Sequence, residues 1–150
     1  MMSDTAAELH DDAQQHLVSA VILSERGLAA ALESLIARSP VPADLRAPHE
    51  RLAPAAEAAI YFTVAEALTN VAKHGQATMA SVRVNVQNGL ISARVLDDGV
   101  GGANADAGSG LRGLSDRLEA LGGSLAIISP SGAGTIIRAT LPARISAIAS

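Results

Sequence analysis

The chain has 150 residues, 49% of them apolar, which suits a single domain with an ample core. It contains no cysteine, one Tyr, one Phe and no Trp, so disulfides and thiolate metal sites are excluded, and aromatic stacking on single-stranded nucleic acid is not expected. The formal charge is −4, with 11 Lys and Arg that form no basic run among 15 acids, which argues against any nucleic-acid partner.

The N-terminal region is polar and acidic, without the basic and hydrophobic segments of a secretory signal. No stretch of the chain is apolar and long enough to span a bilayer, so we expect a cytoplasmic protein without a membrane segment. Residues 4–23 are predicted to form a helix that is capped near Ser3 or Asp4.

A second helix is predicted over Gly27–Arg38, where leucine and isoleucine recur at helical spacing until a Ser-Pro pair ends the pattern. The short segment Val41–Ala47 is bounded by prolines, which indicates an edge strand because proline cannot donate to a ladder of strand hydrogen bonds. A loop is predicted over Pro48–Leu52.

The most informative stretch is a long helix predicted from Pro54 to His74, which Gly75 ends. At about 100° per residue, apolar side chains gather on one side of it: Ile60, Val64, Leu68 and Val71. The opposite side carries an acid, an amide, an amine and an imidazole: Glu66, Asn70, Lys73 and His74. The second set has the chemistry of a surface that binds a metal and phosphates. Each residue taken alone also has an ordinary explanation, either as a solvent-facing side chain or as a cation favoured near a helix C-terminus.

A β-hairpin is predicted next, because apolar and polar residues alternate over 82–87 and 91–95 around Asn88-Gly89, a strong tight-turn signal. Continuing the second strand puts Asp97 on its apolar face. A carboxylate in that position needs a partner, and either a nearby backbone amide or a ligand would provide one.

Glycine-rich segments surround the next predicted helix, Leu111–Leu121. Gly108 and Gly110 precede its start, where exposed backbone N–H groups and the helix dipole favour an anion, although such glycines more often form ordinary turns. Two further strands are predicted over Leu125–Ile128 and Thr135–Leu141.

Four segments in this order resemble the ATP-binding domain of the GHKL superfamily, which includes gyrase, Hsp90, histidine kinases and MutL. The segment EALTNVAKH resembles the N box, DDGVGG the first glycine box, GSGLRGL the second and GAGTIIRATLP the last. The N-box wording, GLRGLSDR and the short lid between Gly102 and Gly108 resemble sensor histidine kinases that act with NarL-type regulators. The resemblance covers roughly Leu28–Arg144. It implies an α/β (α+β) two-layer sandwich in which a mixed sheet carries helices on one face, the Bergerat-type ATP-binding fold.

The resemblance also implies ATP and Mg²⁺ as ligands, with a role for each matching residue. Asn70 would hold Mg²⁺, and Glu66 would orient or deprotonate water near the metal. Lys73 and His74 would meet the phosphates, while Asp97 would accept a hydrogen bond from the exocyclic amine of adenine. The remaining nucleotide contacts would come from Gly99, Gly101, Gly108, Gly110, Leu111 and Thr135.

The N-terminal segment ELHDDAQQHL resembles the phosphoacceptor box of the same kinases, with His10 as acceptor, Asp11 as neighbouring base and Gln15 as a phosphatase residue. A surface histidine is the alternative for His10. The long helical hairpin that separates this box from the ATP domain in those kinases is not present between them here. We therefore divide the chain into a residual phosphoacceptor and dimerisation segment, a GHKL domain and a tail: residues 1–26, 27–144 and 145–150.

Two functional classes remain open on the sequence. One is the catalytic domain of a histidine kinase, which moves the γ-phosphoryl group of ATP to a histidine and then to a response regulator. The other is a nucleotide-binding regulatory module without autokinase activity. An anti-sigma-type serine kinase is a third possibility, against which the GLRGLSDR and ELHDD wording argues.

Overall fold

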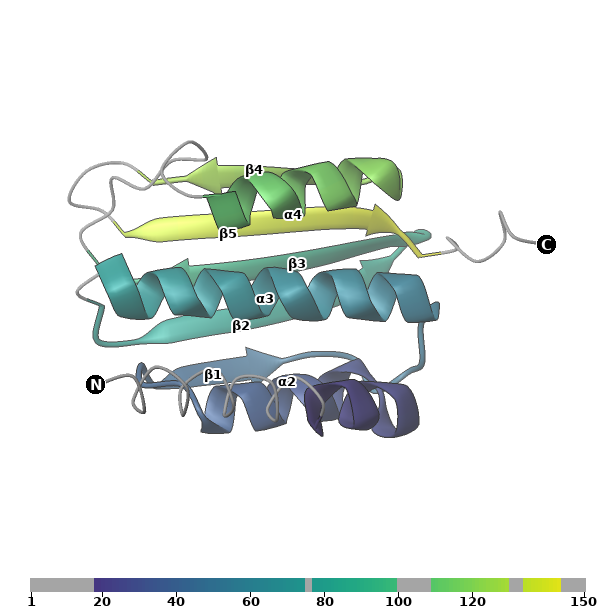
Figure 1. The fold of residues 1–150 in the computed structure, drawn as a ribbon, viewed down its shortest axis with the longest axis horizontal. Helices are drawn as coiled ribbons and strands as arrows, with labels where there is room; N and C mark the ends of the chain where they lie inside the picture. The colour runs from purple at the N-terminus through teal and green to yellow at the C-terminus, as the bar shows by residue number, and fades with distance from the viewer. Residues whose placement is uncertain (1–17, 75–76, 100–108, 130–133, 144–150) are drawn as a thin grey trace, which may run out of the picture.

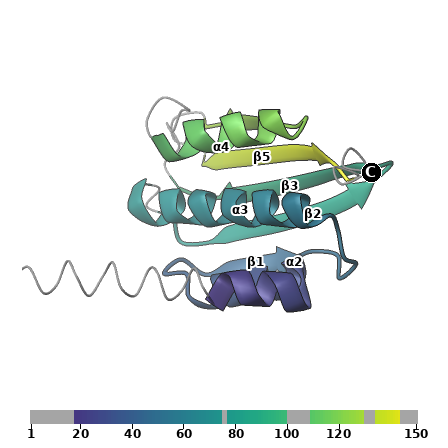
Figure 2. The same cartoon turned by 45° about the vertical axis from the view of Figure 1, so that its right-hand side comes forward.

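The computed structural model describes residues 18–74, 77–99, 109–129 and 134–143. These residues form two layers, a five-stranded sheet and a set of helices that cover one of its faces (Figures 1 and 2). The predicted two-layer α/β sandwich with helices on one face is confirmed.

The sheet has the strand order β1-β2-β3-β5-β4. Its strands are β1 (Ala43–Arg46), β2 (Ala80–Gln87), β3 (Leu90–Asp97), β4 (Ser124–Ile128) and β5 (Thr135–Pro142). Strand β1 runs parallel to β2, and the other neighbouring pairs are antiparallel, so the sheet is mixed as predicted. The short β1 lies at one edge, which confirms the prediction from its flanking prolines.

Three helices are bounded within the described residues: α2 (Leu28–Ala37), α3 (Pro54–His74) and α4 (Ser109–Ala120). Helix α3 has the predicted bounds, and α4 begins two residues before the predicted start. Residues 18–26 are also helical, so the predicted end at residue 23 was wrong. That helix runs on until Gly27, whose φ of 95° stops it and whose N–H donates to the carbonyls of Ile22 and Leu23.

The core lies between α3 and the sheet and is built from aliphatic side chains of moderate size. The apolar stripe predicted on α3 is buried, with each member at most 4% exposed. It meets the alternating residues of the hairpin, including Val82, Ile91 and Val95. The hairpin turn has φ values of 53° at Asn88 and 78° at Gly89, the left-handed pair that matches the twist of the flanking strands.

A partly buried ion pair joins the start of α3 to the preceding loop and to the helical residues 18–26. Glu57 is 1% exposed and accepts hydrogen bonds from Arg51 Nε at 3.2 Å, Arg51 Nη2 at 3.3 Å and Leu52 N at 3.2 Å. The same guanidinium donates to the carbonyls of Leu23 and Ser24. Arg51 therefore satisfies carbonyl groups at the C-terminal end of residues 18–26 and neutralises a buried carboxylate at the same time.

Candidate functional site

Four segments that carry predicted site residues meet at one end of the sandwich. Helix α3 and strand β3 finish there, and strand β5 and helix α4 begin there (the left-hand end in Figure 1). These segments are far apart in sequence, and the antiparallel pairing of β3 with β5 sets Asp97 directly opposite Thr135. The fold thus gathers the N-box helix, the Asp97 strand and the last box at one place.

The polar side of α3 is available to a ligand. Glu66 and Asn70 lie one turn apart and are both half-buried. Phe62, one turn before Glu66, lies 5.5 Å from the guanidinium of Arg117, so this side of α3 faces α4. Among the described residues, no hydrogen bond or ion pair engages the side chain of Glu66 or Asn70. Lys73 belongs to the last turn of the same helix.

Asp97 occupies the last position of β3, on the helix-covered side with the buried residues Ile91, Ala93 and Val95. Its Oδ1 accepts a hydrogen bond from Gly99 N at 2.8 Å. A backbone amide is therefore one of the two partners predicted for this carboxylate. The second carboxylate oxygen has no protein partner among the described residues. The carboxylate is half-buried, and the hydrogen bond from Gly99 N fixes the position of Oδ1.

Two residues beside Asp97 complete this corner. Thr135 is 9% exposed, and its hydroxyl pairs with that of Ser129 at 2.7 Å. Gly134 has a φ of 76°, and a Cβ at this position would lie 2.3 Å from the carbonyl oxygen of Asp97. Only glycine fits so close to the Asp97 backbone. The segment GAGTIIRATLP was identified as a box, but Gly134 and Ser129 were not named from the sequence because their roles depend on the pairing of strands β3 and β5.

The neighbouring carboxylate has a structural role instead. Asp98 accepts hydrogen bonds from the Thr78 hydroxyl at 2.5 Å, Thr78 N at 2.8 Å and Met79 N at 3.1 Å. These donors, the Thr78 hydroxyl foremost, hold the pKa of the Asp98 carboxyl below its usual value. Asp98 therefore fastens the chain that leads into β2 against the end of β3.

The remaining predicted residues divide between the first turn of α4 and parts of the chain outside the described residues. Gly110 lies in that first turn, and Leu111 is 4% exposed, so Leu111 packs in the core. Gly99 is described and donates to Asp97 as above. His10, Asp11, Gln15, Gly101 and Gly108 lie outside the described residues, as do the side chains of Lys73 and His74.

Comparison with known proteins decides the family. Residues 55–145 match the family described as histidine kinase-, DNA gyrase B- and HSP90-like ATPases. The chain belongs to this ATPase family. The resemblance inferred from the four sequence segments is confirmed, and the domain is an ATP-binding domain of the histidine-kinase type.

Three proteins similar to this ATPase domain are histidine kinases. It is 30% identical over 99 residues to the signal transduction histidine-protein kinase/phosphatase DegS of Bacillus subtilis, which covers 62% of this chain and 26% of DegS. It is 34% identical over 90 residues to the oxygen sensor histidine kinase NreB of Staphylococcus carnosus, covering 57% of this chain and 26% of NreB. The sensor histidine kinase MctS of Rhizobium johnstonii is 32% identical over 133 residues, 81% of this chain and 29% of MctS. The chain thus spans less than a third of the length of these three relatives.

Solved structures show the same fold for the ATPase domain. The blue-light activated histidine kinase of Erythrobacter litoralis superposes with a TM-score of 0.67 at 23% identity, over 77% of this chain and 42% of that one. The histidine kinase AdeS of Acinetobacter baumannii superposes with a TM-score of 0.55 at 14% identity, over 92% of this chain and 80% of that one. In the described part of the chain, every helix is too short or too polar to cross a membrane.

Proposed function

We propose that this ATPase domain binds ATP together with Mg²⁺ and serves a histidine kinase by presenting the γ-phosphoryl group to a histidine. The observation that carries the proposal is the position of Asp97, which is half-buried and oriented by Gly99. Its second carboxylate oxygen has no partner among the described residues and is left for a ligand. Asp97 lies at the same end of the fold as Glu66 and Asn70, whose side chains have no hydrogen-bond partner among the described residues. This placement supports a nucleotide whose base meets Asp97 and whose phosphates meet α3.

The donor set on α3 fits magnesium. The Asn70 amide oxygen and the Glu66 carboxylate are hard oxygen ligands, which this ion prefers, and nucleotide phosphates and water would complete its shell. In the proposed arrangement Asn70 holds the ion and Glu66 orients water beside it. When bound, Mg²⁺ offsets the negative charge of the phosphates.

The proposed transfer has two steps. A histidine nitrogen attacks the γ-phosphorus, the bond between the γ-phosphorus and the β–γ bridging oxygen breaks, and ADP leaves. The phosphoryl group then passes from the histidine to an aspartate of a response regulator. DegS and NreB are histidine kinases by name, which supports a response regulator as the partner, and the N-box wording is the ground for proposing a regulator of the NarL type.

Replacing Asn70 should expose the metal dependence of nucleotide binding. We expect Asn70→Ala to weaken ATP binding about tenfold in the presence of Mg²⁺, the loss of roughly one charge-assisted contact. With the metal removed by EDTA, the variant and the parent should bind ATP almost equally. Isothermal titration calorimetry with and without Mg²⁺ measures both values.

The adjacent residue provides the control for Asn70. Thr69 is exposed, and among the described residues its hydroxyl donates only to the carbonyl of Ala65 in its own helix, so Thr69→Ala should leave the ATP affinity unchanged. An ATP affinity of the parent chain that does not depend on Mg²⁺ would show that the metal role of Asn70 is wrong.

Phosphorylation of His10 tests which functional class this chain represents by itself. Phosphoryl transfer requires an acceptor that is held in line with the γ-phosphate, and few residues separate His10 from the ATPase domain. We expect ATP binding with very slow or undetectable labelling by γ-labelled ATP, and faster labelling when a histidine-bearing helical bundle from a longer relative is supplied. His16→Gln serves as the control for His10→Gln. Rapid, stoichiometric and acid-labile labelling that only His10→Gln removes would contradict this expectation.

A further inference from the structure

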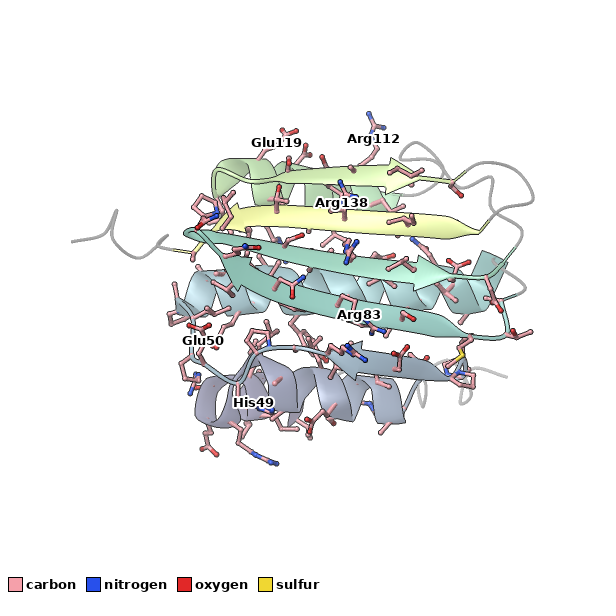
Figure 3. All side chains as sticks on the ribbon, turned by 180° about the vertical axis from the view of Figure 1, so that it is seen from behind. His49, Glu50, Arg83, Arg112, Glu119 and Arg138 are labelled. Atoms are coloured by element: carbon pink, nitrogen blue, oxygen red, sulfur yellow. The ribbon has the colours of Figure 1, made fainter. Side chains whose placement is uncertain are left out.

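Four arginines form a line across the face of the sheet that the described helices leave uncovered. The strand register pairs Arg46 of β1 with Arg83, Arg83 with Arg94 of β3, and Arg94 with Arg138 of β5. Figure 3 looks onto this face and shows Arg83 and Arg138 along the line. Four of the 11 Lys and Arg of the chain thus gather in one row, although they form no basic run in the sequence.

The arginine row is mostly unneutralised. Arg83 bonds the Asp44 carboxylate at 2.6 Å, which, with the Ser81 hydroxyl, holds the pKa of Asp44 below its usual value. Within the described residues, Arg46, Arg94 and Arg138 contact no carboxylate and donate no hydrogen bond. Like charges at directly opposed positions destabilise a sheet, so this row lowers the stability of the fold rather than adding to it. The Asp44–Arg83 pair shows that a carboxylate can neutralise an arginine of this row.

The rows on either side of the arginines differ in character. On one side lie exposed or half-buried apolar residues: Leu96, Ile136 and Ile128, the last 46% exposed. On the other side lie amides and hydroxyls: Asn85, Ser92, Thr140 and Ser124. A hollow of about 480 Å³ lies where the arginine row meets this polar row, with Arg94, Arg138 and Thr140 in its lining. Arginine beside apolar side chains and a polar rim is the composition of protein interfaces.

We propose that this open face docks an acidic amphipathic helix of a protein partner. Neighbouring strands lie about 4.8 Å apart, so successive arginines match carboxylates at positions i and i+4 of a helix, whose Cβ atoms are about 5–6 Å apart. Guanidinium groups bind such carboxylates in bidentate pairs. An apolar stripe beside the acids then covers Leu96, Ile136 and Ile128.

The probe for this proposal is a synthetic helical peptide with glutamates spaced i, i+4 and leucines on the adjacent stripe. Its control is a peptide of the same composition in shuffled order. With the 150-residue chain we expect the patterned peptide to bind at least fivefold more tightly than the shuffled one. Arg94→Gln with Arg138→Gln should weaken its binding at least tenfold, without lowering the melting temperature, because neither side chain bonds another described residue.

Arg26→Gln is the control for this double variant, because it removes an exposed positive charge away from the sheet, in the helical residues 18–26. It should change peptide binding less than twofold, and every variant should retain the ATP affinity of the parent. Equal binding of both peptides, or an equal loss in Arg26→Gln, would overturn the proposal. Tighter binding of duplex DNA that depends on Arg94 and Arg138 would reassign the face to nucleic acid, and a dimer abolished by the double substitution would reassign it to a second copy of the chain.

Discussion

Replacing Asp97 by asparagine should weaken ATP binding about 10- to 100-fold and reverse the preference for adenine over guanine. Gly99 N already donates to Oδ1, so in the variant the amide oxygen stays on Gly99 and the NH₂ group takes the second position. There it would meet the exocyclic amine of adenine, donor against donor. A mismatched buried group of this kind costs about 1.5–3 kcal/mol, and each 1.4 kcal/mol is a factor of ten. Guanine, which has a carbonyl oxygen at that place, should bind the variant better than it binds the parent.

The adjacent carboxylate separates this effect from a general disturbance of the strand end. Asp98→Asn changes the same functional group one residue later, where the contacts are to Thr78 and Met79. It should leave the ATP-to-GTP preference unchanged, even if it lowers stability. Calorimetric titration of the parent and both variants with ATP and GTP measures the preference. Equal affinity of the parent for the two nucleotides would refute the adenine role of Asp97.

Replacing Arg51 by methionine should lower the free energy of unfolding by about 3 kcal/mol. The substitution leaves the Glu57 carboxylate, 1% exposed, with Leu52 N as its remaining described partner, and breaking one side of a buried pair costs about 3–5 kcal/mol. The lower end applies because Arg51 itself is half exposed, at 49% of its side chain, and water already reaches part of the pair. Urea denaturation followed by circular dichroism gives the value.

The double variant identifies the cause of this loss. Arg51→Met with Glu57→Met removes both charges and should recover more than half of the lost stability, since apolar replacement of a buried ion pair is often neutral. An equally large loss in the double variant would show that the hydrogen bonds of Arg51 to the carbonyls of Leu23 and Ser24, rather than its charge opposite Glu57, stabilise the fold.

Periodicity was sufficient to predict the elements that bury one face. Helix α3 could be bounded from Pro54, its apolar stripe and Gly75, and the hairpin from alternating valines around Asn88-Gly89. Local composition determines such features, because burial of one face and the conformation of a turn depend on residues close in sequence. The position of Asp97 on the covered face followed in the same way.

Features that depend on long-range pairing could not be predicted. The pair between Arg51 and Glu57 depends on where the loop crosses the start of α3, and the residues around it gave no periodic signal. Gly134 matters only because β5 lies beside the end of β3. The arginine row requires the register of four strands, and shifting any strand by one residue would turn its arginine to the other face.

Helix α3 is long enough to keep a pair that stabilises the fold far from a residue proposed to bind the nucleotide. Its 21 residues extend about 31 Å, with the Arg51–Glu57 pair at the first turn and Asn70 near the last. Glu57 and Asn70 are 13 residues apart, about 20 Å along the helix axis. Substitutions at that separation, with no shared contacts, act additively, so a double variant of Arg51 and Asn70 should show both the stability loss of the first and the weaker ATP binding of the second. A saturating nucleotide should therefore raise the stability of Arg51→Met by the same increment as that of the parent, an increment set by ligand concentration and affinity alone.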